Sequence, residues 1–445
     1  MKRLIASAGL VAVGATGLQA AYAPGLTPME TAKTWSVAAS LRGFYDDNYN
    51  TAPSHPSSSS LPAAKGSFGA EISPQFALNF PGDQTFVGAS YVYTLRYYEA
   101  RANNNTDHNH ELNAKLDHRF SERYRVVLSD SFAYSQEPEV LESNGTVTTP
   151  LRTSADGLRN TVNLKLTGQI TELLGFETGY QNTWYNYFQT ASDFAKDAIP
   201  AGSNPLGIGS RAALLDRIEQ LFDIKGTWQV QEHLLAFAGY KYGIVNYTSH
   251  DPVDQNPITL ATDSGSIRDN VSHYFYLGAS RSFSSQLTGS IQAGAQYTHF
   301  EHISNNSWTP YVDLSGTYSY LPGSSVQLGF RHQRNATDVL GNPGAITGDQ
   351  ETSTVYASIN HRVTSQLTAS LVGQYQMSQF NGGTFDGKVD NFLFANLTVV
   401  YRFNRNWAAE ASYYFDKLDS GLPDTFGQDR SFKRDRYYVG VRANY

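Results

Sequence analysis

The chain contains no cysteine, which excludes disulfide bonds and thiolate metal sites. It is also short of charge, because Asp, Glu, Lys and Arg make up only 16% of its 445 residues. The formal net charge of -7 argues against nucleic acid as a partner, and no motif in the sequence calls for a cofactor. A soluble protein with so few charges would be unusual, so the composition directs attention to the membrane.

The sequence has no apolar run long enough for a membrane-spanning helix. The longest, Leu4 to Leu18, follows Lys2 and Arg3 and is short and rich in Gly and Ala. Ala21-Tyr22-Ala23 then offers a small-x-small cleavage site, with Ala20 as the alternative position. These features predict a signal peptide over residues 1–23, and therefore export through the inner membrane.

The most frequent pattern in the sequence is a strict alternation of apolar and polar residues. Ser67 to Phe80 places Phe, Ala, Ile, Pro, Phe, Leu and Phe on one side and mostly small or polar residues on the other. Successive side chains of a strand point to opposite faces, so this segment has one apolar face and one polar face. Soluble strands typically have about 5 or 6 residues, whereas crossing a bilayer at a tilt takes about 9 to 11. The segment is therefore typical of a transmembrane strand.

The same pattern recurs along the chain. Eighteen alternating segments are expected, over residues 33–49, 67–80, 85–101, 110–120, 124–136, 159–170, 174–188, 212–228, 234–248, 271–283, 287–299, 308–321, 325–335, 351–363, 367–378, 390–403, 407–418 and 433–445. The weakest are 110–120, 124–136 and 212–228, where a polar residue such as Asp130 interrupts the apolar face.

The connections between these segments alternate in length. Short turns such as 171–173, 284–286 and 404–406 resemble one another, and longer stretches rich in Ser, Pro, Asn, Asp and Gly fall between them. Short periplasmic turns and long outer loops are typical of bacterial outer-membrane barrels. A soluble sandwich or solenoid would have shorter strands and would bury one dry face, whereas here the second face carries Gln, Thr, Ser, Lys and Arg.

The expected fold class is thus all-β: an antiparallel up-and-down transmembrane β-barrel of about 18 strands, with 16 possible, in the bacterial outer membrane. The expected organisation is a signal peptide at 1–23, a short periplasmic lead-in at 24–32 and the barrel at 33–445. A receptor of about 22 strands with a plug would need a longer chain. The high aromatic content, 13% with 29 tyrosines, suits the girdles at the two membrane interfaces.

Registering each segment by its apolar face predicts twenty charged residues that line the bore. The basic ones are Arg42, Arg96, Lys115, Arg119, Arg125, Lys165, Arg217, Lys225, Lys241, Arg331, Arg362, Arg402 and Arg442. The acidic ones are Glu71, Asp117, Glu177, Glu219, Asp223, Asp313 and Glu410. The excess of six positive charges on a net negative chain places the negative balance in loops and turns, with Asp46, Asp47 and the stretch from Asp416 to Asp424 as examples. Such a bore would mildly favour anions; alternatively, the charges pair across strands and stiffen the wall.

A second inward set is aromatic: Tyr98, Tyr185, Tyr274, Tyr276, Tyr311, Tyr356, Phe392, Phe394, Tyr414 and Tyr438. Such rings could stack on sugars and guide a glycan, or could fill space beneath the loops. The long loops 189–211 and 249–270 are candidates for folding inward and narrowing the bore.

Metal and catalytic sites are poorly supported. The pairs His108 with His110 and His299 with His302 could ligate a metal, but loop histidines are more often solvated. The cluster Asp46-Asp47-Asn48 has oxygen ligands that suit calcium, without the glycine and distal glutamate of a calcium loop. No G-x-S-x-G or comparable pattern isolates a nucleophile, so we expect no enzyme.

Three stretches suggest a family: Lys33 to Asn50 (KTWSVAASLRGFYDDNYN), Ser129 to Pro138 (SDSFAYSQEP) and Tyr437 to Tyr445 (YYVGVRANY). Together they resemble the poorly characterised outer-membrane β-barrel porins, some of which accompany exopolysaccharide-export genes. The terminal stretch alternates and ends on an aromatic residue, Tyr445 where many such signals end in Phe, and resembles the strand signal read by the barrel-assembly machinery.

The resemblance implies a porin-like channel for small hydrophilic solutes, in contact with outer-membrane lipid and lipopolysaccharide. The alternative is the outer-membrane component of an exopolysaccharide-secretion system with periplasmic partners. A third class, a structural or adhesive surface protein displaying Ser/Asn-rich loops, also fits the pattern.

Overall fold

The structure is a computed structural model, which describes residues 33–53, 63–136, 156–196, 204–255, 259–303, 306–342, 344–422 and 430–445. The expected signal peptide and lead-in lie outside the described residues, as does most of the loop 137–158. No helix in the described part of the chain is both long and apolar enough to cross a membrane.

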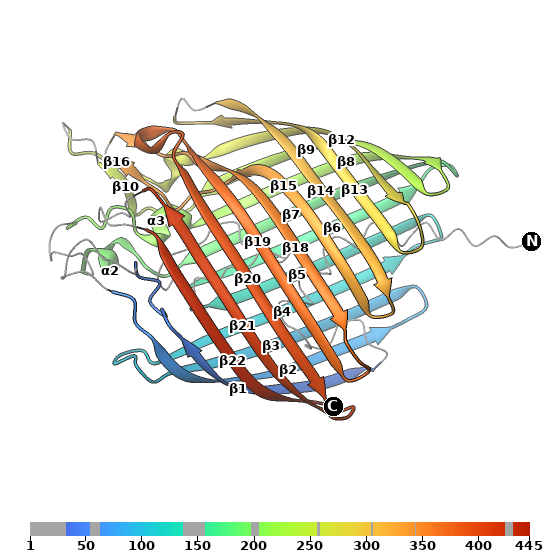
Figure 1. The fold of residues 1–445 in the computed structure, drawn as a ribbon. Helices are drawn as coiled ribbons and strands as arrows, with labels where there is room; N and C mark the ends of the chain where they lie inside the picture. The colour runs from blue at the N-terminus through green and yellow to red at the C-terminus, as the bar shows by residue number, and fades with distance from the viewer. Residues whose placement is uncertain are drawn as a thin grey trace, which may run out of the picture.

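Within the described residues, eighteen strands form one closed antiparallel barrel (Figure 1). They are β1 (Trp35–Asp46), β2 (Ser67–Pro81), β3 (Thr85–Tyr98), β4 (Thr106–Arg119), β5 (Tyr124–Ser135), β6 (Gly157–Gln169), β7 (Leu174–Tyr187), β8 (Arg217–Gln231), β9 (Leu234–Tyr247), β12 (Asn270–Ser282), β13 (Leu287–Phe300), β14 (Ser307–Leu321), β15 (Ser324–Asn335), β18 (Asp349–Arg362), β19 (Leu367–Asn381), β20 (Val389–Arg402), β21 (Trp407–Ser420) and β22 (Phe432–Asn444). Each strand pairs with its neighbours along the chain, and β1 pairs with β22 to close the sheet. The predicted fold class is confirmed.

One predicted segment is wrong at its start. Residues 212–215 were expected to begin a strand, but they belong to the short helix α3 (Arg211–Leu215), and β8 begins only at Arg217. Ser210 caps this helix, since its side chain accepts a hydrogen bond from the Ala213 amide at 3.1 Å. Helix formers behind a serine cap outweigh the alternation here.

The two faces of the barrel differ as the alternation predicts. In β2, Phe68 is 64% exposed while its neighbour Glu71 on the opposite face is 1% exposed. The apolar face points outward to lipid. Large aromatic side chains gather on that face near the end of the barrel where the chain terminates, as an interfacial girdle requires: Trp35, Phe80, Phe120, Phe283, Phe403, Trp407 and Tyr445.

The short turns at one rim share a local structure. In each, the side chain of the first polar turn residue accepts a hydrogen bond from the amide three residues on: Thr171 from Leu174, Ser284 from Leu287, Thr364 from Leu367 and Asn404 from Trp407. This explains why these turns resemble one another in sequence, since a short oxygen-bearing side chain is needed at that position. By the usual asymmetry of outer-membrane barrels this rim is periplasmic.

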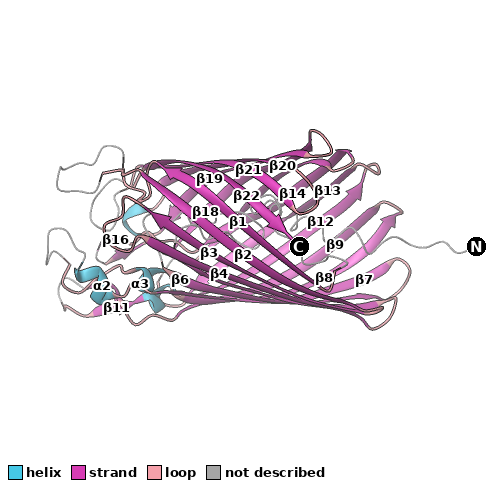
Figure 2. Ribbon diagram, turned by 90° about the horizontal axis from the view of Figure 1, so that it is seen from below, coloured by secondary structure: helices cyan, strands magenta, loops and turns pink. Residues whose placement is uncertain are grey.

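The opposite, extracellular rim carries the longer loops, which contain the remaining short elements of the described residues. These are α2 (Ala191–Lys196), α3, β10 (Pro252–Gln255), β11 (Thr262–Ser264), the 3-10 helix η1 (Gly265–Arg268), β16 (Gly341–Asn342), β17 (Ala345–Ile346) and the 3-10 helix η2 (Gly383–Phe385). Figures 1 and 2 show α2 and α3 at the end of the barrel opposite the C-terminus. The sequence did not predict these elements.

Candidate functional site: the inner wall of the barrel

The inner wall contains all twenty charged residues that the sequence assigned to the bore. Residues directly opposite each other in an antiparallel ladder share a face, so the inward position of Glu71 extends to Arg42 in β1 and Arg96 in β3. Following the ladder from strand to strand places the remaining seventeen on the same face. Their role in conduction stays a prediction.

A buried carboxylate organises one side of the wall. Glu71 accepts hydrogen bonds from Arg42 Nε at 2.9 Å and from Arg96 Nε at 2.6 Å. Arg42 also lies 3.6 Å from Glu410 in β21, so four charges from β1, β2, β3 and β21 form one network. Charge-assisted bonds of this kind fix side chains as well as strand register.

The other side of the wall is paired in the same way. Glu177 in β7 binds Lys165 of β6 at 2.7 Å and Lys225 of β8 at 2.8 Å. Farther along the wall, Arg331 and Asp313 lie 3.1 Å apart on adjacent strands. Cross-strand pairing, one of the two interpretations of the sequence, therefore describes much of the inner wall.

Tyrosines continue these networks between β8 and β14. The Tyr276 hydroxyl donates to Asp223 at 2.6 Å, and Lys241 donates to the Tyr311 hydroxyl at 3.1 Å. The rings of Tyr276 and Tyr311 lie 6.2 Å apart in an edge-to-face arrangement. These rings are thus tied to charged groups and present little free face for stacking.

Eight more charged residues lie on the inner face that the sequence interpretation did not assign to it. They are Asp46, Asp107, Glu111, Arg159, Asp390, Asp416, Arg434 and Arg436. Asp46 and Asp416 were placed in loops, which is wrong, because both lie in strands and bind Arg434 and Arg436. With five acidic and three basic additions, the positive excess falls from six to four. The sequence does contain the signal that places Asp46 on the inner face, because the alternation of β1 puts it on the same face as Arg42.

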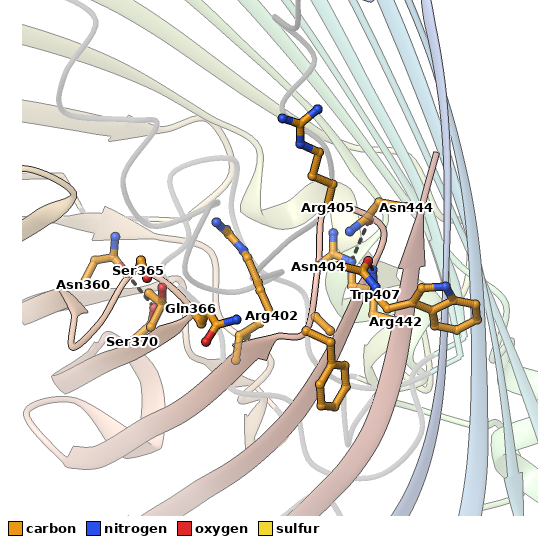
Figure 3. A pocket seen from close by; sticks show the side chains of 14 residues that line it. Asn360, Ser365, Gln366, Ser370, Arg402, Asn404, Arg405, Trp407, Arg442 and Asn444 are labelled. Atoms are coloured by element: carbon orange, nitrogen blue, oxygen red, sulfur yellow. Dashed lines mark hydrogen bonds between the residues drawn. The ribbon is translucent and has the colours of Figure 1, made fainter.

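Basic residues without an acidic partner gather at the periplasmic end. Arg119, Arg362 and Arg402 each end a strand at that rim, and among the described residues none of the three forms an ion pair. Arg402 also lines a cavity of 650 Å³ with Arg405 and Arg442. Figure 3 shows these arginines beside Asn360, Ser370 and Asn444.

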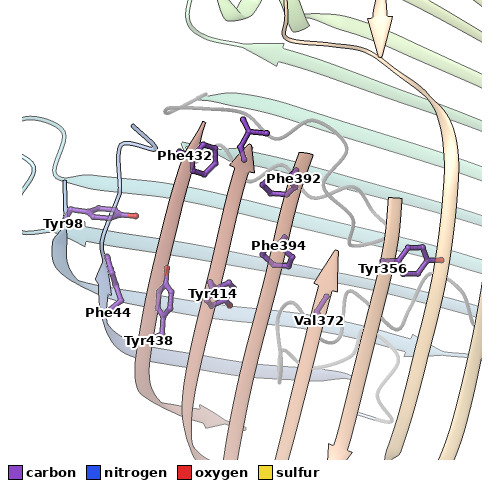
Figure 4. Close-up of a cluster of buried hydrophobic side chains, with 10 residues drawn as sticks. Phe44, Tyr98, Tyr356, Val372, Phe392, Phe394, Tyr414, Phe432 and Tyr438 are labelled. Carbon is purple, nitrogen blue, oxygen red and sulfur yellow. The ribbon is translucent and has the colours of Figure 1, made fainter. Parts of the chain in front are cut away.

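Six of the ten predicted inward aromatics lie in one buried cluster. Figure 4 shows them on β3 and on the strands from β18 to β22: Tyr98, Tyr356, Phe392, Phe394, Tyr414 and Tyr438. Phe44 and Phe432 complete the aromatic part of the cluster and were missed. Phe44 packs over Gly69, its direct partner in β2, where any larger side chain would overlap the ring. Because the rings are buried against each other, they fill space.

The extracellular mouth is covered by loops that bind one another. Leu214 and Leu215 of α3 pack against Tyr185 and Tyr187 at the top of the inner wall. The buried Arg268 of η1 donates to the carbonyl oxygens of Leu214 at 2.5 Å and Thr337 at 3.1 Å. The loops that follow β7, β9 and β15 are thereby joined through one guanidinium.

Two carboxylates in these loops extend the connections. Asp338 binds Arg211 at 3.4 Å and Arg430 at 3.1 Å, which links the loops after β15, β7 and β21. Asp216, which follows α3, accepts a hydrogen bond from the Tyr187 amide at 2.6 Å. Burial raises the pKa of Asp216 to about 7, and nearby Asp251 acts in the same direction. This carboxyl therefore titrates near neutrality.

The histidine pair at positions 108 and 110 and the calcium candidate Asp46 have other partners. His108 and His110 lie on the outer face, where the Nδ1 atom of each lies 2.8 Å from a tyrosine hydroxyl, that of Tyr93 and that of Tyr91 respectively. Asp46 is occupied by Arg434. Within the described ranges, no group of three or more His, Asp or Glu residues could hold a metal ion.

The closed barrel, its lipid-facing girdle and its polar inner wall define a porin-like protein of the bacterial outer membrane. Residues 259–445 match the family model described as "Putative beta-barrel porin 2". The resemblance drawn from the sequence is confirmed over this part of the chain. Comparison with curated protein sequences gave no match.

Solved structures with a similar architecture share little sequence with this chain. A mutant of the ferric enterobactin receptor PfeA of Pseudomonas aeruginosa is 9% identical, with a TM-score of 0.46 over 92% of this chain and 80% of its own. OccAB4 of Acinetobacter baumannii is 12% identical, with a TM-score of 0.41 over 94% of this chain and 100% of its own. OpdQ of Pseudomonas aeruginosa is 9% identical, with a TM-score of 0.40 over 92% of this chain and 97% of its own.

Proposed function

We propose that this protein is a non-enzymatic channel that conducts small hydrophilic solutes across the outer membrane and mildly favours anions. The observation that carries the proposal is the inner wall itself, a largely polar surface with more basic than acidic side chains around a barrel of eighteen described strands. Barrels of 16 to 18 strands are wide enough to leave an aqueous channel, and fixed charges along a channel set its ion selectivity.

The loops that cover the extracellular mouth would limit the size of the solute. Residues of these loops pack against Tyr185 and Tyr187, and so lie over the extracellular end of the inner wall between β7 and β9. The periplasmic end carries the 650 Å³ cavity instead. We therefore expect a channel that is narrower at its extracellular end than at its periplasmic end.

Planar-bilayer recording of the refolded protein tests the proposal, with heat-modifiable gel mobility as the check on folding. We expect discrete conductance steps and a reversal potential in a KCl gradient on the anion-selective side. Folded protein that gives no steps would refute the channel, and a cation-selective current would refute the preference.

The second candidate is an outer-membrane component of exopolysaccharide secretion, with periplasmic partners. The covered extracellular mouth favours it, because a secretion channel must stay closed until its cargo arrives. Constitutive conductance supports the first function. A closed barrel together with a neighbouring cluster of glycosyltransferase genes supports the second. In either case we propose that the C-terminal strand β22 is the signal for the barrel-assembly machinery and that the outer face contacts lipid and lipopolysaccharide.

A further inference from the structure

The charges of the inner wall are sorted along the barrel axis. Near the extracellular rim, inward carboxylates are matched by arginines, as Asp46 is by Arg434 and Asp416 by Arg436. Near the periplasmic rim, arginines outnumber carboxylates. The positive excess of the wall is thus concentrated at the periplasmic mouth, where a solute leaving or entering the bore must pass.

Three of these arginines face one cavity. Arg402 ends β20, Arg405 lies in the turn that follows, and Arg442 lies near the end of β22. Figure 3 shows Arg402 and Arg405 extending into the same space from one side of the turn, with Arg442 on the neighbouring strand. Ala408 of β21 lies between Arg402 and Arg442, while Thr368 and Ser370 of β19 line another part of the cavity, whose volume is 650 Å³.

The polar groups of the cavity are suited to an anion. None of the described residues that line it is acidic. The nearest inner carboxylate along β21, Glu410, is engaged by Arg42 at 3.6 Å. Amide side chains complete the lining, including Gln366, Asn404 and Asn444. Guanidinium groups bind phosphate and carboxylate through paired hydrogen bonds, and amides add donors at the margin.

We infer that this cavity is a binding site for anionic solutes that carry a phosphate or carboxylate group, with Arg402 and Arg405 as the principal ligands. The site concentrates such solutes at the periplasmic mouth of the bore. The inference rests on the proposed channel for its purpose, although binding itself does not require conduction.

Binding is measured with glucose 6-phosphate as the probe and glucose as the neutral comparison, by calorimetry on the folded full-length barrel in detergent. The test variant is the double substitution R402Q/R405Q. The matched control is R123Q, which removes one positive charge from an exposed periplasmic turn outside the cavity. We expect glucose 6-phosphate to bind the wild type, the double variant to bind at least tenfold more weakly, and R123Q to stay within twofold of the wild type.

Equal affinity of the wild type and R402Q/R405Q would overturn the inference, as would equal binding of glucose and glucose 6-phosphate. If the double variant does not fold, R405Q alone, in the exposed turn, carries the test with an expected loss of at least threefold. A conductance measurement separates the two proposals. Glucose 6-phosphate is added to one side of the bilayer, and its block of the KCl current is recorded. Binding without conductance refutes the channel alone, and conductance without binding refutes the site alone.

Discussion

Arg434 holds Asp46 across the seam where the last strand meets the first. Its Nε lies 3.1 and 3.0 Å from the two carboxylate oxygens, and both side chains are almost completely buried, at 2% and 0% exposure. The pair joins β22 to β1 where the barrel closes. These two inward charges therefore stabilise the contact that closes the sheet.

Removing one partner of this pair should weaken the barrel strongly. The D46N variant leaves the Arg434 charge buried without its carboxylate, which costs about 3–5 kcal/mol. Urea unfolding followed by tryptophan fluorescence measures the loss. K417Q is the control, because the Lys417–Asp419 pair is exposed and contributes less than about 1 kcal/mol. A similar, small effect of both variants would contradict a structural role of the seam pair.

Glu71 should set both stability and selectivity. E71Q leaves Arg42 and Arg96 without their shared carboxylate, so we expect a lower free energy of unfolding and a reversal potential shifted further toward anion selectivity. The reason is one fewer negative charge inside the bore. E122Q, in an exposed periplasmic turn, removes the same charge outside the bore and should leave the reversal potential within error of the wild type.

The loop cover should loosen as pH rises through the range from about 4 to 7. The pKa of Asp216 is raised in the folded state, so between its ordinary value and about 7 the folded form is protonated while the unfolded form is ionised. Packing around α3 is then most stable at low pH and loses that stability up to about pH 7, beyond which it stays constant. Hydrogen exchange of the amides of residues 212–216 at pH 5 and 8, corrected for intrinsic rates, measures this.

In D216N the carboxyl no longer titrates, so the difference in protection between the two pH values should shrink. Stronger protection at pH 8 than at pH 5 in the wild type would show that the sign is wrong.

Asp130 should be replaceable by leucine with a gain in stability. The register places it on the outer face, opposite Ala114 in β4 and Val162 in β6, and its Oδ1 is buried without a hydrogen bond among the described residues. A polar group at this depth faces hydrocarbon, so D130L should raise the free energy of unfolding in bilayers by about 1–2 kcal/mol. S131L, on the inner face next to it, should bring no such gain, and a loss with D130L would argue that Asp130 has a partner.

The sequence predicted strands and faces better than it predicted contacts. Alternation alone puts Glu71 inward, because a residue's face depends only on its own strand. Its bonds to Arg42 and Arg96 depend on the register of two further strands, which single-strand alternation does not contain. The Asp46–Arg434 pair joins residues 388 positions apart, and only closure of the barrel brings them together.

The loops were beyond the reach of periodicity. α3 is a five-residue helix, too short to establish a 3.6-residue repeat, and its one readable sign was Ser210 before a run of helix formers. The buried position of Arg268 had no sign at all, since an arginine between two surface loops is ordinarily solvated. By contrast, the interruption of the apolar pattern at Asp130 correctly indicated a polar side chain on the otherwise apolar outer face.

The shared carboxylate of Asp338 has an evolutionary consequence. Because one side chain binds Arg211 and Arg430 from two different loops, those loops cannot diversify independently, even though surface loops of outer-membrane proteins are ordinarily free to vary. Among related sequences, loss of the acid at position 338 should coincide with loss of both arginines. Insertions should then fall in the parts of the extracellular surface that lie outside these three connected loops.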